Sequence, residues 1–387
     1  MKRREFVKSL ASAGVLSAVG VGQAGAAAAA PGSVKASLRD RFFGCIVGCH
    51  LGSAMGAPVE GWPFERIEKE HGLLERLLPY EHYRNGWKRE PGTTEDGVER
   101  QKLMITAIIE KKDRVTAEDV RSIWLRDIKP ESAGMVSEPF EAVLLAMAKS
   151  GIPARDLGRY CDYAGLVSMA RSCHPIGLIN AGDVPNAIAD VFEVGQLYQT
   201  SNSRGLKWAA VTAAAIAAAT NPGATAESVI TAILEQCDAK VANEIKTGLK
   251  RTAECRDVRE LRKAFDSLYS GAGVPYAFSY ANEVVTKAVC IFRMVNGNLK
   301  QALVAGINMG RDTDCVTAIA AGISGALDGA GSVPEEWIRQ VDYATSLNRY
   351  TNSQRTLRQT SDGLYEAFRS RLNKAKAYAE RMLSHES

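Results

Sequence analysis

Residues 308–330 read NMGRDTDCVTAIAAGISGALDGA and place two carboxylates, Asp312 and Asp314, directly before a run of small apolar residues. Gly310 can end a preceding helix, Asp312 or Thr313 can cap the next one, and the alanine, isoleucine and glycine residues that follow have helical spacing. The stretch therefore predicts a buried helix with an acidic pair at its N-terminus. The helix dipole favours carboxylates there, and their hard oxygens suit Mg²⁺, Mn²⁺ or Ca²⁺. Helix capping and metal binding both account for the pair.

A second oxygen-rich cluster follows a Pro-Gly turn signal and precedes a stretch with helical spacing, 98–111. It consists of Thr94, Glu95 and Asp96, and it too can serve as a helix cap. Glu60, in the segment GSAMGAPVEGW, is a third acidic position. Three such groups in one chain predict a shared site.

The stretch 38–55 predicts a helix with glycines at every fourth position from Gly44 to Gly56. Four residues turn a helix by about 400°, so these glycines form one smooth ridge. Each glycine destabilises a helix by roughly 1 kcal/mol relative to alanine, which implies a compensating close contact. We predict that the partner is the small-residue helix 316–327, and that this packing brings Glu60 near the acidic pair. A membrane helix is the rival interpretation, and His50 and the flanking charges count against it.

The segment 61–92 is charged and aromatic, with Trp62, Tyr80, His82, Tyr83 and Trp87. It can be a lid whose aromatic rings contact a sugar or a base, or a surface excursion with locally packed rings.

Elsewhere the pattern is helical, without strand-like alternation or tandem repeats. The elements together predict an all-α bundle.

The composition excludes several functional classes. The chain has 387 residues, 46% hydrophobic residues and a formal charge of +4, of which the first 30 residues supply four basic side chains and one acidic one. The remainder is close to neutral, which argues against a polyanionic partner such as nucleic acid. The eight cysteines are dispersed and fit no disulfide framework, so we expect mostly buried thiols.

The N-terminus resembles a twin-arginine export signal. Arg3 and Arg4 precede an apolar stretch, 10–21, that is too short for a stable membrane span, and the alanines of 24–30 offer cleavage sites. We expect residues 1–30 to be a signal peptide, 31–37 a linker, and the protein to be periplasmic or secreted.

The three acidic segments resemble, in the same order, the motifs of the ADP-ribosylglycohydrolases. Those motifs are G-D-x-x-G-x-x-x-E, then T-D-D, then G-G-D-T-D-T followed by a small-residue helix. The resemblance runs from about 38 to about 331 and implies a single all-α domain with a metal cleft. The amphipathic, charged stretch 332–387 goes beyond the family's motifs, and we expect it to be a C-terminal helical extension.

The resemblance also implies the roles of particular residues. Family members bind two Mg²⁺ or Mn²⁺ ions through the second and third motifs, and the glutamate of the first motif lies by the metals and the scissile bond. Glu60 is thus the implied catalytic residue. The implied metal ligands are Thr94, Glu95, Asp96, Asp312, Asp314 and, in the position of the last threonine, Cys315.

The sequence departs from the family pattern at four positions: Ser53 and Glu95 replace aspartates, Arg311 replaces a glycine and Cys315 replaces a threonine. A soft thiol is a poor partner for Mg²⁺, so we predict that one of the two metal sites is altered. Thr317, one turn beyond the acidic pair, could substitute.

Two arginines have open roles. Arg311 could meet a phosphate or pair with Asp312 or Glu95. Arg171 loosely matches an arginine of the family and receives no role.

The resemblance implies a hydrolase that cleaves an N- or O-glycosidic bond at the anomeric carbon of an ADP-ribosyl or related ribosyl substrate, either a small molecule or a glycosylated one. Two alternatives stay open. Export favours a different glycoside, because NAD is scarce outside the cytoplasm. The changes at Ser53, Glu95 and Cys315 favour a non-catalytic binding or structural protein on the same scaffold.

Overall fold

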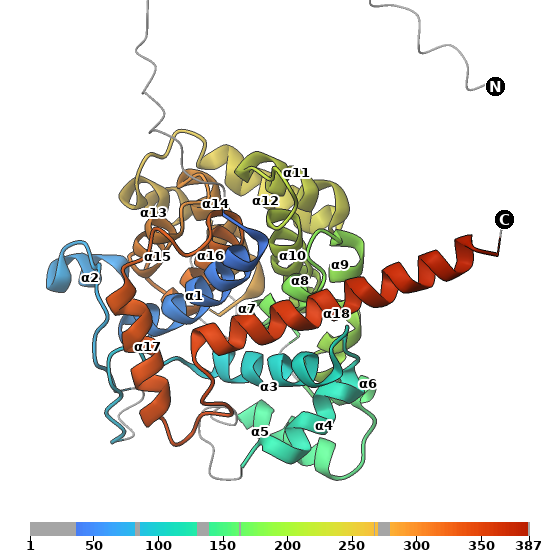
Figure 1. Cartoon of the computed structure of the whole chain (residues 1–387). Helices are drawn as coiled ribbons and strands as arrows, with labels where there is room; N and C mark the ends of the chain where they lie inside the picture. Colours follow the sequence, from blue (N-terminus) through green and yellow to red (C-terminus); the bar gives the residue numbers. More distant parts are fainter. Residues whose placement is uncertain are drawn as a thin grey trace, which may run out of the picture. The chain divides into compact units, whose positions relative to one another are not determined.

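The structure, a computed structural model, describes residues 36–81, 86–129, 139–161, 164–266, 268–269 and 279–385. The predicted signal peptide lies outside these residues. The described residues form helices and turns, with two isolated β-bridges and no strand among them. The predicted all-α fold is confirmed (Figure 1). The helices, in chain order, are α1 (Leu38–Gly56), α2 (Phe64–His71), α3 (Asp96–Lys111), α4 (Ala117–Asp127), α5 (Pro139–Lys149), α6 (Ala154–Leu157), α7 (Ser168–Ser172), α8 (His174–Ile179), α9 (Val184–Val194), α10 (Arg204–Ala219), α11 (Ala226–Gln236), α12 (Ala239–Arg251), α13 (Val258–Asp266), α14 (Ala281–Met294), α15 (Leu299–Ile307), α16 (Thr313–Asp328), α17 (Glu335–Leu347) and α18 (Leu357–Leu383).

The pair of helices α1 and α16 lies at the centre of the bundle, and their backbones touch. A Cβ atom added to any of the four ridge glycines would lie 2.2–2.6 Å from a backbone atom of α16. Gly44 faces Gly325 and Gly56 faces Asp314, so the helices run antiparallel. The predicted contact is confirmed, and it sets the end of α1 beside the start of α16.

Among the described residues, one segment is long and apolar enough to cross a membrane: α1 with the 3₁₀ turn that follows it, Leu38–Val59. However, 94% of its most apolar window is buried inside the protein. Its apolar character is that of a core helix, because the neighbouring helices cover it.

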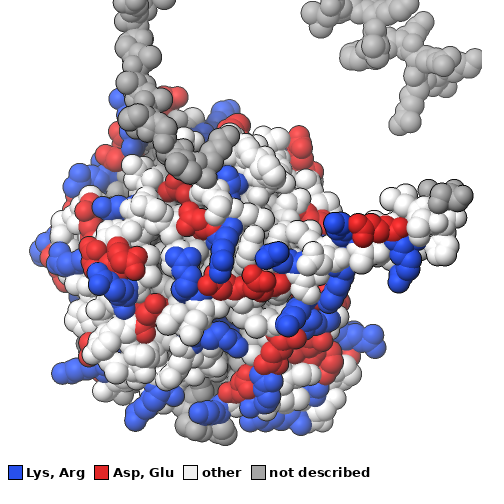
Figure 2. Space-filling model, in the orientation of Figure 1, with Lys and Arg blue, Asp and Glu red and all other residues white. Residues whose placement is uncertain are grey.

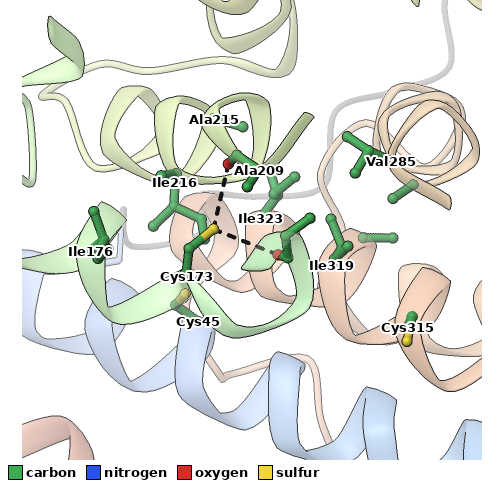
Figure 3. Packing of buried hydrophobic residues seen from close by; sticks show 14 of the residues in the cluster. Cys45, Cys173, Ile176, Ala209, Ala215, Ile216, Val285, Cys315, Ile319 and Ile323 are labelled. Atoms are coloured by element: carbon green, nitrogen blue, oxygen red, sulfur yellow. Dashed lines mark hydrogen bonds between the residues drawn. The ribbon is translucent and has the colours of Figure 1, made fainter. Parts of the chain in front are cut away.

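The alanine-rich helix α10 packs against α7, α8, α9, α14 and α16 and completes the core. Figure 3 shows Cys173 among the isoleucines of this region, where its thiol donates to the carbonyl of Ala209 at 3.4 Å. All eight cysteines are free thiols and six are buried, as the sequence predicts.

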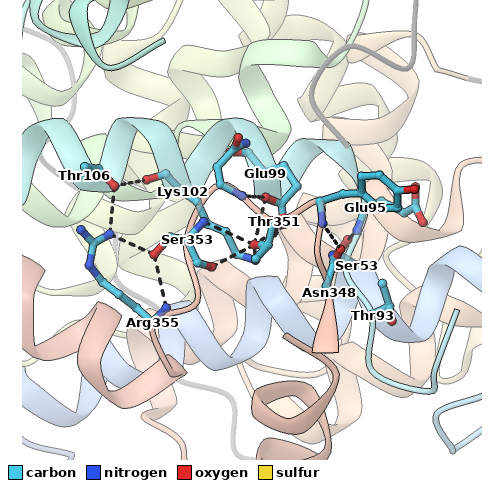
Figure 4. Close-up of polar contacts among 12 residues, drawn as sticks. Ser53, Thr93, Glu95, Glu99, Lys102, Thr106, Asn348, Thr351, Ser353 and Arg355 are labelled. Atoms are coloured by element: carbon cyan, nitrogen blue, oxygen red, sulfur yellow. Dashed lines mark hydrogen bonds and ion pairs between the residues drawn. The ribbon is translucent and has the colours of Figure 1, made fainter. Parts of the chain in front are cut away.

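The segment after residue 331 packs onto the bundle. The first half of α18 contacts α1, α3 and α8, and the loop before it covers α3 through polar contacts (Figure 4). In this loop, the backbone NH of Asn352 donates to Glu99 at 2.7 Å, and Arg355 donates to Thr106 at 2.9 Å. The last turns of α18, from residue 372 onward, are exposed and extend past the neighbouring helices (Figure 1).

Acidic and basic side chains are interspersed on the face drawn in Figure 2, including the exposed end of α18. This mixture matches the small net charge of the chain without residues 1–30.

Candidate metal centre

Three potential metal ligands meet at the start of α16. One carboxylate oxygen each of Asp312 and Asp314 and the Sγ of Cys315 all lie within 4.8 Å of one another, and all three side chains are buried. Among the described residues, no other group of three or more histidine, cysteine or acidic side chains lies close enough together to hold a metal ion. Their arrangement brings together three of the six predicted ligands.

The acidic pair does not cap the helix. Asp312 occupies the N-cap position of α16, but its side chain makes no capping hydrogen bond. Both carboxylate oxygens of Asp312 and Oδ1 of Asp314 are buried and have no hydrogen-bond partner among the described residues. Since a buried, unpartnered carboxylate is strongly destabilising, these oxygens need either a proton or a counter-charge. A divalent cation fits this donor set.

The ionisation of these groups reflects the same burial. Removal from water, and then repulsion from Asp314 and Glu60, raises the pKa of Asp312 well above its usual value. Burial also raises the pKa of Asp314 and that of the Cys315 thiol. A cation bound here would displace protons from its ligands.

A tight turn fixes Glu60 next to this pair. The backbone NH of Gly61 donates to the carbonyl of Arg311, and the NH of Arg311 donates to the carbonyl of Trp62, both at 2.8 Å. Gly310 makes this approach possible, because it has a φ of 74° and a Cβ would lie 2.7 Å from the nitrogen of Phe64. Glu60 is half-buried and contributes to the raised pKa of Asp312.

The second cluster starts α3 and is also not a cap. Glu95 occupies the N-cap position, and its side chain makes no capping hydrogen bond. Instead its carboxylate accepts a short hydrogen bond from the hydroxyl of Tyr80 and lies 3.5 Å from Nε of Arg89. Ser53 accepts a hydrogen bond from the backbone NH of Glu95 at 3.0 Å, which ties α1 to α3 (Figure 4).

Asp96 is held by two arginines. Its Oδ2 lies 2.8 Å from Nη2 of Arg100 and 2.6 Å from Nη2 of Arg171, while its Oδ1 accepts from the backbone NH of Gly97. Burial alone would raise the pKa of Asp96, but the two guanidinium groups outweigh it and the pKa is lowered. Asp96 is therefore a carboxylate with its counter-charges already in place.

Arg171 joins the two clusters. Its other terminal nitrogen, Nη1, donates to Sγ of Cys315 at 3.5 Å. A small cavity of about 10 Å³ is lined by Arg171, Asp314, Cys315 and Ser53, together with Gly97, Val98 and Ala318. The acidic ends of α3 and α16 thus face a common space.

A larger cavity of about 640 Å³ opens on the other side of Glu60. Trp62, His71 and Tyr80 line it, and the rings of Trp62 and His71 stack with their centroids 6.0 Å apart. Tyr80, which lines this cavity, also contacts Glu95 of the second cluster. His82 and Tyr83 of the predicted aromatic segment lie outside the described residues.

The remaining predicted positions have other contacts. Thr94 is buried in the turn before α3. Thr317 donates a short hydrogen bond to the carbonyl of Thr313 and packs against Gly306. Arg311 pairs with Glu283 through two hydrogen bonds of 2.6 and 2.9 Å rather than with Asp312 or Glu95.

The sequence interpretation missed the arginines of the site. Arg171 lies in the apolar stretch LVSMARSC, and an arginine in such a stretch is buried and has to be paired, which was the available signal. Arg89 and Tyr80 carried no such signal. They contact Glu95 because an antiparallel β-bridge between them orders an otherwise irregular segment.

The fold and this centre define an all-helical protein with a candidate divalent-metal site in its core. The chain belongs to the ADP-ribosylglycohydrolase family, whose sequence profile matches residues 34–373. This family is a family of hydrolases.

Individual relatives resemble nearly the whole chain. The uncharacterized protein YegU of Escherichia coli (strain K12) is 24% identical over 346 residues, which are 84% of this chain and 99% of YegU. An uncharacterized protein of Archaeoglobus fulgidus is 24% identical over 314 residues, 78% of this chain and 91% of that protein. A solved structure titled ADP-ribosylglycohydrolase-related protein complex has a TM-score of 0.61 at 15% identity, covers 86% of this chain and 98% of its own, and shares the fold.

Proposed function

We propose that this protein is a Mg²⁺- or Mn²⁺-dependent hydrolase that cleaves an N- or O-glycosidic bond at the anomeric carbon of an ADP-ribosyl or related ribosyl substrate. One observation carries this proposal: in a chain of a glycohydrolase family, three buried carboxylate oxygens of Asp312 and Asp314 have no hydrogen-bond partner in the part of the chain that the structure describes. Asp312, Asp314 and Cys315 would hold the ion. When bound, it would supply Lewis acidity, which favours negative charge on sugar oxygens and activates water.

Glu60 is the proposed proton acceptor. It lies between the acidic pair and the larger cavity, and it is half-buried, so it can reach a substrate and exchange protons with solvent. The turn fixed by Arg311 and Gly310 holds its backbone in place. Such positioning is what general base catalysis requires.

The larger cavity is the proposed substrate site. A sugar or a nucleobase bound there would contact the aromatic side chains of Trp62, His71 and Tyr80, and Glu60 marks the end at which the bond would break. Closing this end with protein side chains would exclude water from the oxocarbenium-like transition state.

The test is activity before and after chelation. The purified protein should release ribosyl product from one of ADP-ribosyl-arginine, ADP-ribose or a set of nucleosides assayed side by side. Activity should disappear in excess chelator and return with Mg²⁺ or Mn²⁺. Glu60→Gln should reduce kcat by at least about a hundredfold with metal binding intact. Full activity in excess chelator would refute the proposal.

A non-catalytic binding protein is the second candidate. The observation in its favour is that the carboxylates of Glu95 and Asp96 are engaged by arginines. Under this alternative, the same ribosides would raise the melting temperature without being cleaved.

We also propose that the protein is exported, on the strength of the sequence of residues 1–30. Cell fractionation tests this proposal. Replacing Arg3 and Arg4 by lysine should retain the protein in the cytoplasm.

A further inference from the structure

We infer that the centre holds one divalent ion, at Asp312 and Asp314, and that Arg171 and Arg89 stand in for a second one. This inference rests on the proposed function, because it concerns the ion of the same site. It differs from the two-ion arrangement that the family resemblance implies.

The first reason is the contrast between the two clusters. Within the described ranges, three buried oxygens of Asp312 and Asp314 have no hydrogen-bond partner. Glu95 and Asp96 do not, since Tyr80 and Arg89 contact the first and Arg100 and Arg171 contact the second. An arginine guanidinium keeps its charge under all ordinary conditions, so these pairs are permanent features of the site.

The second reason is charge balance. Within the two clusters and their arginine partners, the buried or nearly buried carboxylates are Glu95, Asp96, Glu141, Asp312 and Asp314, with Cys315 counted as a neutral thiol. Glu141 pairs with Arg100. Arg89, Arg100 and Arg171 supply three positive charges against these five negative ones. Two negative charges remain, which one divalent cation neutralises. A second cation would leave the buried site with an excess of positive charge, which is costly at low dielectric.

The third reason is that the chain makes room for Arg171. Gly97, at the start of α3, lies against its stem, and a Cβ there would be 2.7 Å from Cδ of Arg171. The guanidinium then reaches from Asp96 to the sulfur of Cys315. Cys315 occupies the family's threonine ligand position, so the positive group sits between the two ligand sets.

The experiment counts ions. Full-length protein, freed of metal with a chelator, is titrated with Mn²⁺, and bound Mn²⁺ is measured by electron paramagnetic resonance and by elemental analysis after gel filtration. We expect one Mn²⁺ per chain with the spectrum of an isolated ion. Two ions per chain with a spin-coupled spectrum would overturn the inference but leave the proposed function standing. No bound ion would overturn both.

Two sets of variants test the role of the arginines. Asp96→Asn should still bind one Mn²⁺, whereas a loss of affinity of about tenfold or more, as seen when supporting residues of a metal site are removed, would mean that Asp96 serves the ion. Arg171→Gln should admit a second Mn²⁺, and Arg171→Lys, which keeps the charge, should not.

Folding of each variant is checked by circular dichroism. If Arg171→Gln does not fold, the Asp96→Asn, Arg171→Gln double variant removes both charges of the pair and is expected to bind one ion as well as the native chain does. A folded Arg171→Gln protein that binds a single ion, like the lysine variant, would contradict the assignment of Arg171.

Discussion

At the residue scale, the centre differs from an ordinary carboxylate site through Cys315. Its sulfur lies among the oxygens of Asp312 and Asp314, and it accepts a hydrogen bond from Arg171. Thiolate ligands favour softer ions such as Zn²⁺ and Cd²⁺, whereas carboxylates favour Mg²⁺ and Mn²⁺. The mixed donor set therefore predicts a broader choice of ions than an all-oxygen site has.

Replacing this thiol should change the ion preference. In Cys315→Thr, we expect the affinity for Cd²⁺ to fall by about tenfold relative to that for Mg²⁺, because a hydroxyl is a harder ligand. Competition titrations of the metal-free protein measure this ratio. Cys290→Ser, a change at a buried thiol in α14, is the matched control and should leave the ratio unaltered.

Removing one of the unpartnered charges should stabilise the metal-free protein. Asp312→Asn keeps the shape but removes a carboxylate whose pKa is raised by burial and by its neighbours. We expect the melting temperature without metal to rise by about 1–2 °C, since relief of about 1 kcal/mol has that effect in a chain of this length.

With added Mn²⁺, the native protein should have a higher melting temperature than Asp312→Asn, because the native protein gains stability from binding and the variant does not. Asp328→Asn, at the exposed far end of α16, controls for a loss of charge on the same helix. A variant that melts below the native protein in excess chelator would contradict this account of Asp312.

The acidic residues of the site could be read from the sequence, and its arginines could not. Asp312 and Asp314 stand in one short motif at a helix start, a local pattern. The partners of Glu95 and Asp96 depend on how an irregular segment and α7 fold onto α3, which no local spacing encodes. Likewise, Arg311 precedes Asp312 in the chain but pairs with Glu283 on α14.

At the element scale, the contact between α1 and α16 sets Glu60 beside Asp312 and Asp314. Glycine spacing in one stretch and small residues in another were sufficient to predict it, because only helices that touch backbone to backbone need such ridges. The exact end of α2 was not predictable. α2 ends at His71, where Gly72 takes a positive φ.

Filling this contact should destabilise the protein. A Cβ at position 48 would lie 2.2 Å from the carbonyl oxygen of Ala321, a backbone atom that cannot rotate away. We expect Gly48→Ala to reduce the free energy of unfolding by about 3 kcal/mol or more. Gly331→Ala is the matched control, since nothing lies within 4 Å of its Cβ position, and should change it by less than about 0.5 kcal/mol. Equal denaturation midpoints for the two variants would show that the helices can separate without loss.

At the scale of the whole molecule, buried histidines link the core to pH. His174, the first residue of α8, accepts from Gln101 of α3 at 3.2 Å and donates to the carbonyl of Ala318 of α16 at 3.1 Å. Burial lowers its pKa from 6.5 to about 4, and that of His50 to about 3. The neutral form of His174 thus joins three helices, and protonation would break that link.

Acid should therefore weaken the fold. Between pH 6.5 and 4, the unfolded chain binds a proton at His174 and the folded chain does not. Stability is complete above 6.5 and falls by about 1.4 kcal/mol per pH unit for this histidine, or about 3 kcal/mol in all.

Urea denaturation at a series of pH values, compared between the native protein and His174→Gln, isolates this contribution. The native curve should fall more steeply below 6.5 than that of the variant. Parallel curves would mean that His174 takes up its proton without unfolding.

The glycine contact has a consequence for how such a centre can be altered. Because α1 and α16 touch backbone to backbone at the four ridge glycines, the two helices cannot move closer together there, and the scaffold that carries Glu60 and Asp314 is expected to be rigid. Adjustment to a larger or smaller ion cannot come from sliding helices. It has to come from substitution of the side chains at positions 312 to 315, so the chemistry of these side chains decides which ion is selected.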